Sequence, residues 1–486
     1  MTVSHKTALA RMRHVIGLDG AVGYTALSRV CSIVSSAGTV LLLVRFLSPI
    51  EQGYYYTLLS LVLLQTVFEL GFSFVIQQYA AHESVLCAFD IDGRIEGDKT
   101  SHARLASVLR LAIRWYLRAA IAIAAILLPA GFLFFSHKSA GSNHVAWQGP
   151  WIAVVVASAA SFLVAPIYSF LDGCGQIRQV AQARFGQSAM VLAMSWGTMI
   201  SGHGLYAPAM VNLGVVLVGL IFLSGRRRLL LGLLHHPSQG NEVSWQHEIW
   251  PFQWKLAVSW LCTYFITQLF TPVLFLARGP VEAGRMGMSI NIVAYLPLLV
   301  LSWITTKATP FGQLIKLGRL QELDRLFFHT FRQSVAVLLL MIGGCMISVI
   351  GLWHFFPRFA VRMEPPLVFV LLLATAVCTF SVQSMAVYLR SFKVEPFMIQ
   401  SLAVFLMTST GVIIAAPRWG GLGVAVCYFL SNGFFGLTAA TLIFISKRRD
   451  QGSDMVMEGK RQTGTSQITA GSATSSSLPS RAVEET

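Results

Sequence analysis

Charged side chains are scarce in this sequence: Asp, Glu, Lys and Arg together make up 12% of its 486 residues. Soluble domains carry roughly 25% charged residues, so a water-soluble fold of this length could not cover its surface. Hydrophobic residues instead make up 55%, and the mean hydropathy is +0.64. The composition therefore excludes a soluble globular protein and predicts one whose surface faces lipid.

Cysteine pairs are also missing. The seven cysteines are scattered, mostly within apolar runs, and no two form a C-x-x-C pair. This pattern argues against a disulfide framework and against a zinc site. We interpret the cysteines as small apolar packing residues, and we expect no metal and no other cofactor.

Acidic residues are outnumbered by basic ones, 21 to 36, which gives a formal charge of +15. A basic soluble protein would suggest nucleic acid, but no known reading motif accompanies the basic residues here. They lie in short loops between apolar runs, where they orient helices and meet anionic head groups. We therefore expect membrane lipids as partners and no nucleic acid.

Long apolar runs dominate the rest of the chain. A helix that crosses a bilayer needs about 20 apolar residues, and we find twelve candidates: Tyr24–Leu47, Tyr54–Ala80, Trp115–Phe135, Trp151–Leu171, Phe185–Ile200, Tyr206–Ser224, Leu256–Leu276, Met288–Ile304, Val335–Phe356, Leu367–Leu389, Phe397–Ala416 and Leu422–Ser446. The fifth and eighth are shorter than the others. The sequence predicts an all-α integral membrane protein with about twelve transmembrane helices.

The predicted domain organisation follows from these runs. We expect a cytoplasmic N-terminal segment, two six-helix bundles joined by a basic linker, and a polar tail too rich in Ser, Thr and Gly to fold alone. Their residue ranges are 1–23, 24–224, 225–255, 256–446 and 447–486. The first 20 residues are polar and basic and show no cleavable signal peptide.

Orientation is indicated by the basic residues. With the N-terminus in the cytoplasm, seven of the 36 Lys and Arg residues flank the outer helix ends: Arg45, Lys138, Arg278, Arg285, Arg358, Arg362 and Arg418. Apart from Arg29, which lies within the first run, the others flank the inner ends. This bias satisfies the positive-inside rule and places both termini in the cytoplasm.

An internal repeat links the two halves. The turn after the first run contains Pro49, Glu51 and Gly53, and the turn after the seventh contains Pro280, Glu282 and Gly284, each 231 residues later. Two halves of six helices each would have the same topology. Parallel repeats in transporters enclose a solute site between them, so we expect a central cavity between the bundles.

The repeated turn also has a purely structural explanation. Ser48 is a suitable N-cap, Pro49 suits the first helical position, and Glu51 can complete a capping box. The outer arginines Arg45, Arg278 and Arg285 are open to two interpretations, a ring at an exit or caps on the repeated turns. We favour the caps.

These turns resemble a known family. The stretch R-F-L-S-P-I-E-Q-G-Y, followed by F-E-L-G at residues 68–71, resembles the start of polysaccharide flippases of the multidrug, oligosaccharidyl-lipid and polysaccharide exporter superfamily. The second half adds Q-L-F-T-P at 268–272, G-P-V-E-A-G at 279–284, W-I-T-T-K at 303–307 and L-D-R-L-F at 323–327. The resemblance covers residues 24–446.

The resemblance implies two six-helix bundles that form a V around a central cavity. The implied substrate is an undecaprenyl-pyrophosphate-linked oligosaccharide, moved from the cytoplasmic to the periplasmic leaflet of a bacterial inner membrane. Its implied partners are this lipid-linked oligosaccharide and, in the same process, a polysaccharide polymerase and export proteins. Exported polysaccharide, such as O-antigen, would be the product.

Two charged residues fall inside predicted helices, where charges are costly and often functional. Arg29 lies in the first helix and Glu69 in the second, at similar depth from the cytoplasmic side. One hypothesis is a structural ion pair that joins the two helices. The other places Arg29 on the pyrophosphate, since its fork suits phosphate, and makes Glu69 a proton-coupling or gating acid. Snorkelling of either side chain is a third.

Further candidates flank the seventh and eighth helices on the cytoplasmic side. Lys255 and Lys307 could meet an entering head group, and Trp254 and Trp303 could stack on sugar rings. Ordinary anchoring at the membrane interface explains the same residues and is the simpler interpretation. Gln65 and Asn291 could bond sugar hydroxyls or neighbouring helices, and the sequence does not decide between these roles.

Two other functions remain open. A cation-coupled drug or metabolite antiporter of the same superfamily would be expected to carry acids in both halves, yet Val300 occupies the position that repeats Glu69. A membrane polysaccharide polymerase or glycosyltransferase usually presents a large outer loop with catalytic acids. The outer loops here are short and hold no paired carboxylates, so we expect a transporter and not an enzyme.

Overall fold

The structure, a computed structural model, describes residues 20–69, 71–84, 87–89, 95–97, 99–136, 145–234, 250–392 and 396–449. The predicted N-terminal segment, except for its last residues, lies outside the described residues. So do part of the linker and nearly all of the polar tail, whose predicted disorder stays a prediction.

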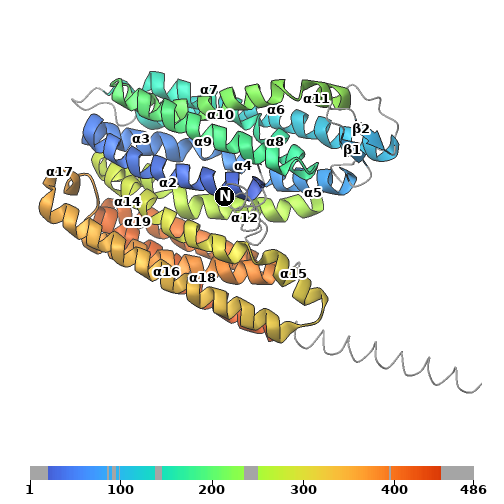
Figure 1. Ribbon diagram of the computed structural model, residues 1–486. Coiled ribbons are helices and arrows are strands. Elements are labelled where there is room, and N and C mark those ends of the chain that lie inside the picture. Colours follow the sequence, from blue (N-terminus) through green and yellow to red (C-terminus); the bar gives the residue numbers. More distant parts are fainter. Residues whose placement is uncertain are drawn as a thin grey trace, which may run out of the picture.

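Helices of different lengths run lengthwise through the N-terminal half (Figure 1). They are α2 (Gly20–Phe46), α3 (Pro49–Val62), α4 (Gln65–Glu69), α5 (Phe72–Ser84), α6 (Lys99–Ser136), α7 (Gln148–Phe162), α8 (Ala165–Gly173), α9 (Ile177–Ile200), α10 (Ala207–Ser224) and α11 (Arg227–Leu234). A 3₁₀ turn, η1, covers Gly204–Tyr206. Between α5 and α6, β1 (Cys87–Phe89) and β2 (Ile95–Gly97) form an antiparallel hairpin in which Cys87 lies opposite Gly97. The all-α prediction did not include this hairpin.

The C-terminal half is also helical. Its elements are α12 (Trp250–Gln268), α13 (Phe270–Arg278), α14 (Pro280–Thr305), α15 (Ala308–Lys316), α16 (Leu320–Phe355), α17 (Pro357–Ala360), α18 (Pro366–Arg390), α19 (Met398–Tyr428) and the π-helix η3 (Phe429–Phe435). The chain then continues as helix to Arg449. The described part of the predicted linker contains α11, whose Leu229 and Leu233 are buried, and the first residues of α12.

Seven of the described helices are long and apolar enough to cross a membrane, and an eighth is added if α12 and α13 form one bent span. The protein is therefore a helical membrane protein. One of the seven, Met398–Arg449, has 52 residues. At about 1.5 Å per residue it is more than twice the roughly 30 Å of a bilayer core.

Breaks in the helices follow glycine and proline. Gly420 has a non-helical conformation with φ of 58° and ψ of −141°, and this divides the long Met398–Arg449 segment near its middle. Pro272 lacks the N–H that would bond the carbonyl of Gln268, and the chain bends by 41° at this point, between α12 and α13. Pro166 lies at the start of α8, where its fixed φ suits a helix.

The two runs that looked short in the sequence belong to full-length helices. The run Phe185–Ile200 is the apolar part of α9, which has 24 residues, and Met288–Ile304 lies within α14, which has 26. The apolar pattern missed their first turns because these turns carry polar side chains such as Arg178 and Arg285. A membrane helix can extend beyond the apolar layer, and its polar residues then lie outside the lipid.

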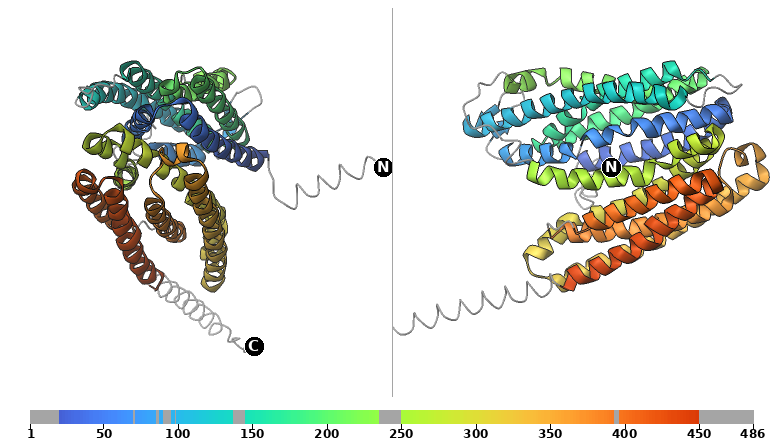
Figure 2. Two further views of the ribbon diagram at one scale, coloured as in Figure 1. Left: turned by 90° about the vertical axis from the view of Figure 1, so that its left-hand side faces the viewer. Right: turned by 180° about the vertical axis from the view of Figure 1, so that it is seen from behind.

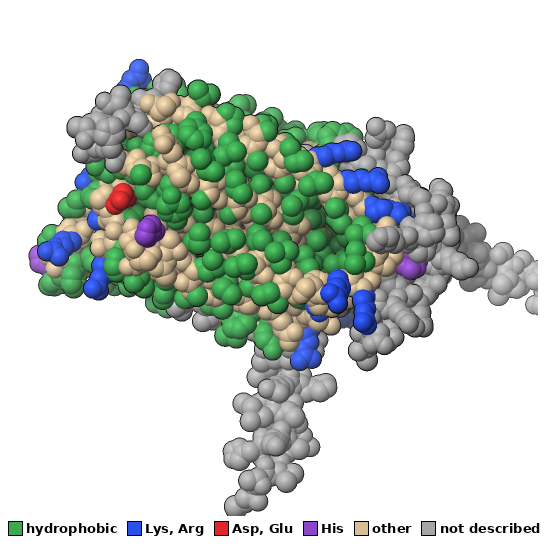
Figure 3. Space-filling model, turned by 90° about the horizontal axis from the view of Figure 1, so that it is seen from above, with side chains coloured by type: hydrophobic (Ala, Val, Ile, Leu, Met, Phe, Trp, Pro, Cys, Tyr) green, Lys and Arg blue, Asp and Glu red, His purple; other side chains and the backbone are tan. Residues whose placement is uncertain are grey.

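The molecule has two distinct ends. We call the one with α17 and the turns at residues 46–49 and 278–280 the α17 end, and the one with α11 and α15 the α15 end (Figure 1). Large apolar side chains such as Leu340 and Ile347 are exposed between them. Seen from above, hydrophobic side chains cover the middle of the surface, and Lys and Arg gather at both ends (Figure 3). This pattern fits a bilayer around the middle of the molecule.

Candidate functional site

The two halves meet along α3 and α14, the helices that follow the repeated turns. Their contact is close because Gly53 and Gly284 lie at the crossing. A Cβ on Gly53 would overlap the carbonyl of Pro280, and a Cβ on Gly284 would lie 2.8 Å from the Gly53 nitrogen. The repeated glycines thus allow the two backbones to touch, as small residues do between membrane helices. Both helices begin at the α17 end.

A polar cluster reinforces this crossing. Gln52 is 1% exposed, and its Nε2 donates to the carbonyls of Gly284 and Arg362, both at 3.0 Å. In return, Arg362 donates to Gln52 Oε1 at 3.3 Å and to the carbonyl of Leu47. Charged donors strengthen such bonds. The contacts between Gln52 and Arg362, together with the Gly53–Gly284 crossing, form what we call the outer seal.

Aromatic rings fill the space beside the outer seal. The Tyr54 ring packs edge-on against Phe275 with centroids 5.0 Å apart, and Phe135 contacts both rings. Nearly two turns further along α3, the Tyr264 hydroxyl donates to the carbonyl of Ser60 at 2.9 Å. The aromatic contacts join the halves near the start of α3, at the α17 end, and the Tyr264 hydrogen bond joins them in its last turn.

Toward the α15 end the two halves separate. The helices α16, α18 and α19 slope away from the N-terminal half along their length (Figure 1), and the view from behind shows the same divergence (Figure 2). Within the described residues, the main contact between the halves in this region is the packing of α12 on α4. The arrangement is closed at the α17 end and divergent at the α15 end.

Polar side chains meet inside the N-terminal half. Gln65 Oε1 accepts a hydrogen bond from Ser158, and Ser161 donates to Asn212 Oδ1 at 2.9 Å. Glu69 accepts one from the Tyr116 hydroxyl at 3.3 Å. Gln65 and Glu69 both lie on α4, which packs against α12 of the other half. The short helix therefore carries polar groups close to where the halves diverge.

The pairing of Arg29 with Glu69 stays a prediction, because the Arg29 side chain lies outside the described residues. The backbone of Arg29 belongs to α2, which packs mainly along α9. There, the Ser28 hydroxyl bonds that of Ser188 at 2.8 Å. Glu69 lies on a helix that packs against α6 and α12.

Four of the other predicted residues lie near the α15 end, and the fifth, Asn291, lies near the middle of α14. Trp254 and Trp303 are 39% and 53% exposed, as expected either of interface anchors or of stacking residues. Lys307 is half-buried between α14 and α15, and the Lys255 side chain lies outside the described residues. Asn291 donates to the carbonyl of Gly287, within its own helix, at 2.8 Å. The alternative roles of these residues stay predictions.

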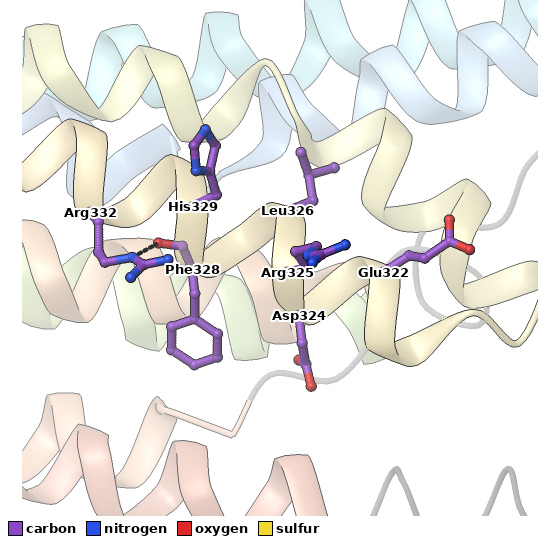
Figure 4. Close-up of a pocket in the computed structure, with 7 residues that line it drawn as sticks. All are labelled: Glu322, Asp324, Arg325, Leu326, Phe328, His329 and Arg332. Carbon is purple, nitrogen blue, oxygen red and sulfur yellow. Dashed lines mark hydrogen bonds between the residues drawn. The ribbon is translucent and has the colours of Figure 1, made fainter.

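A pocket of about 820 Å³ lies along the beginning of α16 and contains none of the predicted site residues. Its lining residues are Glu322, Asp324, Arg325, Leu326, Phe328, His329 and Arg332. They all belong to one helix and point in different directions (Figure 4). Asp324 is bonded to Tyr388 and Arg448. We interpret the pocket as an open surface beside the Asp324–Arg448 ion pair, because all its lining residues belong to α16 and no other described element encloses it.

Sequence reasoning missed Gln52 and Arg362 of the outer seal. Gln52 directly precedes the repeated Gly53, so its place in the turn was the available signal. Arg362 was counted only for orientation. Arg278 and Arg285 donate to backbone carbonyls, those of Arg418 and Val361, at 2.7 and 2.8 Å. Both arginines hold segments of the C-terminal half together, and the choice between caps and an exit ring stays a prediction.

Comparison with known proteins relates this architecture to transporters. No protein-family model matches the sequence, and no curated protein sequence matches it either. The structure resembles the lipid II flippase MurJ in an inward closed conformation, with a TM-score of 0.58, 12% identity and 90% of each chain covered. A multidrug resistance MATE family transporter in its inward-facing conformation gives 0.55 and 16%, covering 87% of this chain and 99% of the other.

A MOP superfamily transporter from Pyrococcus furiosus is similar at a TM-score of 0.57 and 13% identity, over 90% of this chain and 96% of the other. At these identities the likeness concerns the fold alone. The chain therefore has the fold of MOP superfamily transporters, which include both a lipid flippase and drug transporters.

Proposed function

We propose that the protein is an alternating-access transporter that moves an undecaprenyl-pyrophosphate-linked oligosaccharide from the cytoplasmic to the periplasmic leaflet. The observation that carries the proposal is the difference between the two ends of the α3–α14 contact. The outer seal closes the α17 end, whereas the halves diverge toward the α15 end. Such a shape gives access from one side at a time, as parallel repeats in transporters do.

In this proposal the chain has about twelve transmembrane helices in two parallel repeats, and the α15 end faces the cytoplasm of a bacterial inner membrane. The basic residues of α11 and of residues 447–449 favour this orientation. A polar head group would enter between the halves while its lipid tail stays in the bilayer. Gln65 and Glu69 on α4 would contact the polar head group of the substrate, and Arg29 would bind its pyrophosphate.

The lipid-linked substrate is favoured by the sequence motifs and by the similarity to a lipid II flippase. A cation-coupled drug antiporter is the second candidate, because the fold is equally that of MATE transporters. A polysaccharide polymerase or glycosyltransferase has less support, since the structural neighbours are transporters. Substrate identity thus depends on a direct assay.

The test is flipping by the purified chain in liposomes. An undecaprenyl-pyrophosphate-linked oligosaccharide is placed in one leaflet, and its appearance in the other is followed with a lectin that cannot cross. We expect the wild-type chain to accelerate flipping and Arg29→Ala to slow it about tenfold, as the loss of a charged hydrogen bond predicts. Arg178→Ala, an exposed arginine at the α15 end, is the matched control.

No acceleration by the wild-type chain would refute the flippase assignment, and cation-driven uptake of a fluorescent drug in the same liposomes would favour the antiporter. Full flipping by Arg29→Ala at equal protein levels would refute only the role of Arg29.

A further inference from the structure

Two carboxylates, the half-buried Glu282 and the buried Glu364, lie close together at the α17 end of the C-terminal half. Glu282 lies in the first turn of α14, and Glu364 lies in the link between α17 and α18, where it is 4% exposed. A Cβ on Gly420 would overlap Glu282 Oε1, and a Cβ on Gly421 would overlap Glu364 Oε1. Since these glycines are adjacent, both carboxylates reach the same point, the break in α19.

The hydrogen bonds around the pair are incomplete. Glu282 Oε1 accepts the Gly421 N–H at 2.7 Å. The Glu364 N–H donates to Ser289 Oγ at 3.1 Å, but Glu364 Oε1 is buried with no hydrogen-bond partner. A buried, unpartnered carboxylate oxygen is costly. One proton held between two neighbouring carboxyl groups removes this cost and their repulsion together.

Three arginines near the pair donate to backbone carbonyls. The charged groups on the surrounding elements are Glu51, Arg278, Glu282, Arg285, Arg358, Arg362 and Arg418. Arg285 donates through Nε to the Val361 carbonyl at 2.8 Å, and Arg278 donates to the carbonyl of Arg418. Burial and the charge of Glu282 raise the pKa of Glu364 to about 7, and Arg285 opposes this rise.

The pair is connected directly to the outer seal. Residues Val361 to Glu364 form one short link: Val361 is held by Arg285, Arg362 bonds the N-terminal half, and Glu364 packs at the break in α19. A movement of Glu364 would therefore displace Arg362. Gly420, with φ of 58°, supplies a flexible point beside it.

We propose that Glu282 and Glu364 bind one proton between them and that this proton holds the α17 end closed. Loss of the proton leaves two neighbouring negative charges, one of them buried, which separate into water and draw the link away from the N-terminal half. The proposal rests on the proposed function only in treating the α17 end as the exit side. A calcium ion is not favoured, because it takes six to eight oxygen ligands, and the described residues hold no group of three or more His, Cys, Asp or Glu.

The direction of the pH effect follows from linkage. In the closed form the pKa of Glu364 is raised to about 7, whereas a solvated carboxyl has its ordinary value of 4.5. The closed form therefore binds more protons between these values. The open-to-closed ratio should be constant below pH 4.5, should rise by up to about tenfold per pH unit between pH 4.5 and 7, and should level off above pH 7.

Spin labels on opposite halves measure this ratio. Ser201 at the end of α9 and Arg358 on α17 are both exposed at the α17 end, so Ser201→Cys and Arg358→Cys are labelled in a chain whose native cysteines are replaced by Ala. We expect the short distance to dominate at pH 5 and a longer one to gain population toward pH 7.5. Glu364→Gln, which stays neutral, should keep the short distance throughout. Glu322→Gln, at an exposed site on α16, should titrate like the wild type.

Should Glu364→Gln not fold, Glu282→Gln provides a second test. Its amide oxygen can still accept the Gly421 N–H, and removal of the like charge should move the transition to lower pH. A distance independent of pH in the wild type, or unchanged titration in both variants, would overturn the proposal. So would a shift produced at constant pH by exchanging choline for sodium. None of these measurements needs a transported substrate, so failure of the flipping assay leaves them unaffected.

Discussion

The two copies of the repeated turn differ in what their glutamate does. In the first copy, Ser48 and Glu51 form a capping box in which each side chain bonds the other's backbone N–H. In the second copy, Gly279 replaces the serine, with φ of 99° and no side chain to cap α14. Glu282 is then free to reach the Gly421 N–H. One residue difference turns a local cap into a contact between distant helices.

The interiors of the halves differ in a related way. Around α4 the N-terminal half holds polar contacts such as Gln65 with Ser158 and Glu69 with Tyr116. The corresponding part of the C-terminal half is an aromatic cluster, in which Phe327 packs 4.8 Å from Tyr388. The polar contacts around α4 therefore have no equivalent at this place in the C-terminal half, whose paired carboxylates, Glu282 and Glu364, lie at the α17 end.

The largest effect is expected from a substitution at the crossing of the repeated glycines, Gly53 and Gly284. Gly53→Ala adds a methyl group that overlaps the Pro280 carbonyl, and neither backbone can yield easily. We expect a loss of stability of about 3 kcal/mol, the upper part of the usual range for overpacking. Thermal unfolding in detergent measures it.

Two alanine variants serve as controls for that crossing. Gly284→Ala should cost less, since its Cβ would lie 2.8 Å from the Gly53 nitrogen, and Gly197→Ala has open space around it and should be neutral or slightly stabilising. Equal melting of the Gly53 and Gly197 variants would contradict a close crossing.

A second test separates the two parts of the outer seal, the Gln52–Arg362 contacts and the Gly53–Gly284 crossing. Arg362→Ala removes the bonds to Leu47 and Gln52 and leaves Gln52 buried with fewer partners. Hydrogen bonds of charged groups contribute roughly 1.5–3 kcal/mol, so the closed form should lose about 2 kcal/mol, or roughly 30-fold in population. The labelled Ser201–Arg358 pair reports this as a longer distance at pH 5. Arg332→Ala at the α15 end should leave the distance unchanged.

The class of the protein was readable from the sequence because lipid imposes a composition that no soluble fold tolerates. The capping box at Ser48 was also predictable and is confirmed, because capping depends on neighbours within one turn. The repeated Pro, Glu and Gly positions were visible as well, and they mark the closest contact of the halves.

What the sequence could not show depends on contacts between distant segments. Gln52 and Arg362 are 310 residues apart, and nothing local distinguishes Arg362 from the other outer arginines. Glu282 and Glu364 meet only because α19 breaks at Gly420. The neighbours of α2 were equally hidden: its main partner is α9, and six helices lie between the two in the sequence. Local patterns predict helices and caps, whereas partners across a bundle follow from the fold.

The smallest expected effect concerns the serine that distinguishes the two turns. Ser48→Ala removes the hydroxyl that accepts the Glu51 N–H at 3.2 Å, and such a loss costs about 1 kcal/mol. Ser48→Gly, which imitates Gly279 of the second copy, should cost only a few tenths, because glycine leaves the helix end open to water. Melting temperatures of the two variants decide between these values. If Ser48→Ala melts like the wild type, Ser48 does not stabilise the start of α3. The contrast between Glu51, which caps its own helix, and Glu282, which bonds a distant helix, would then have no energetic basis.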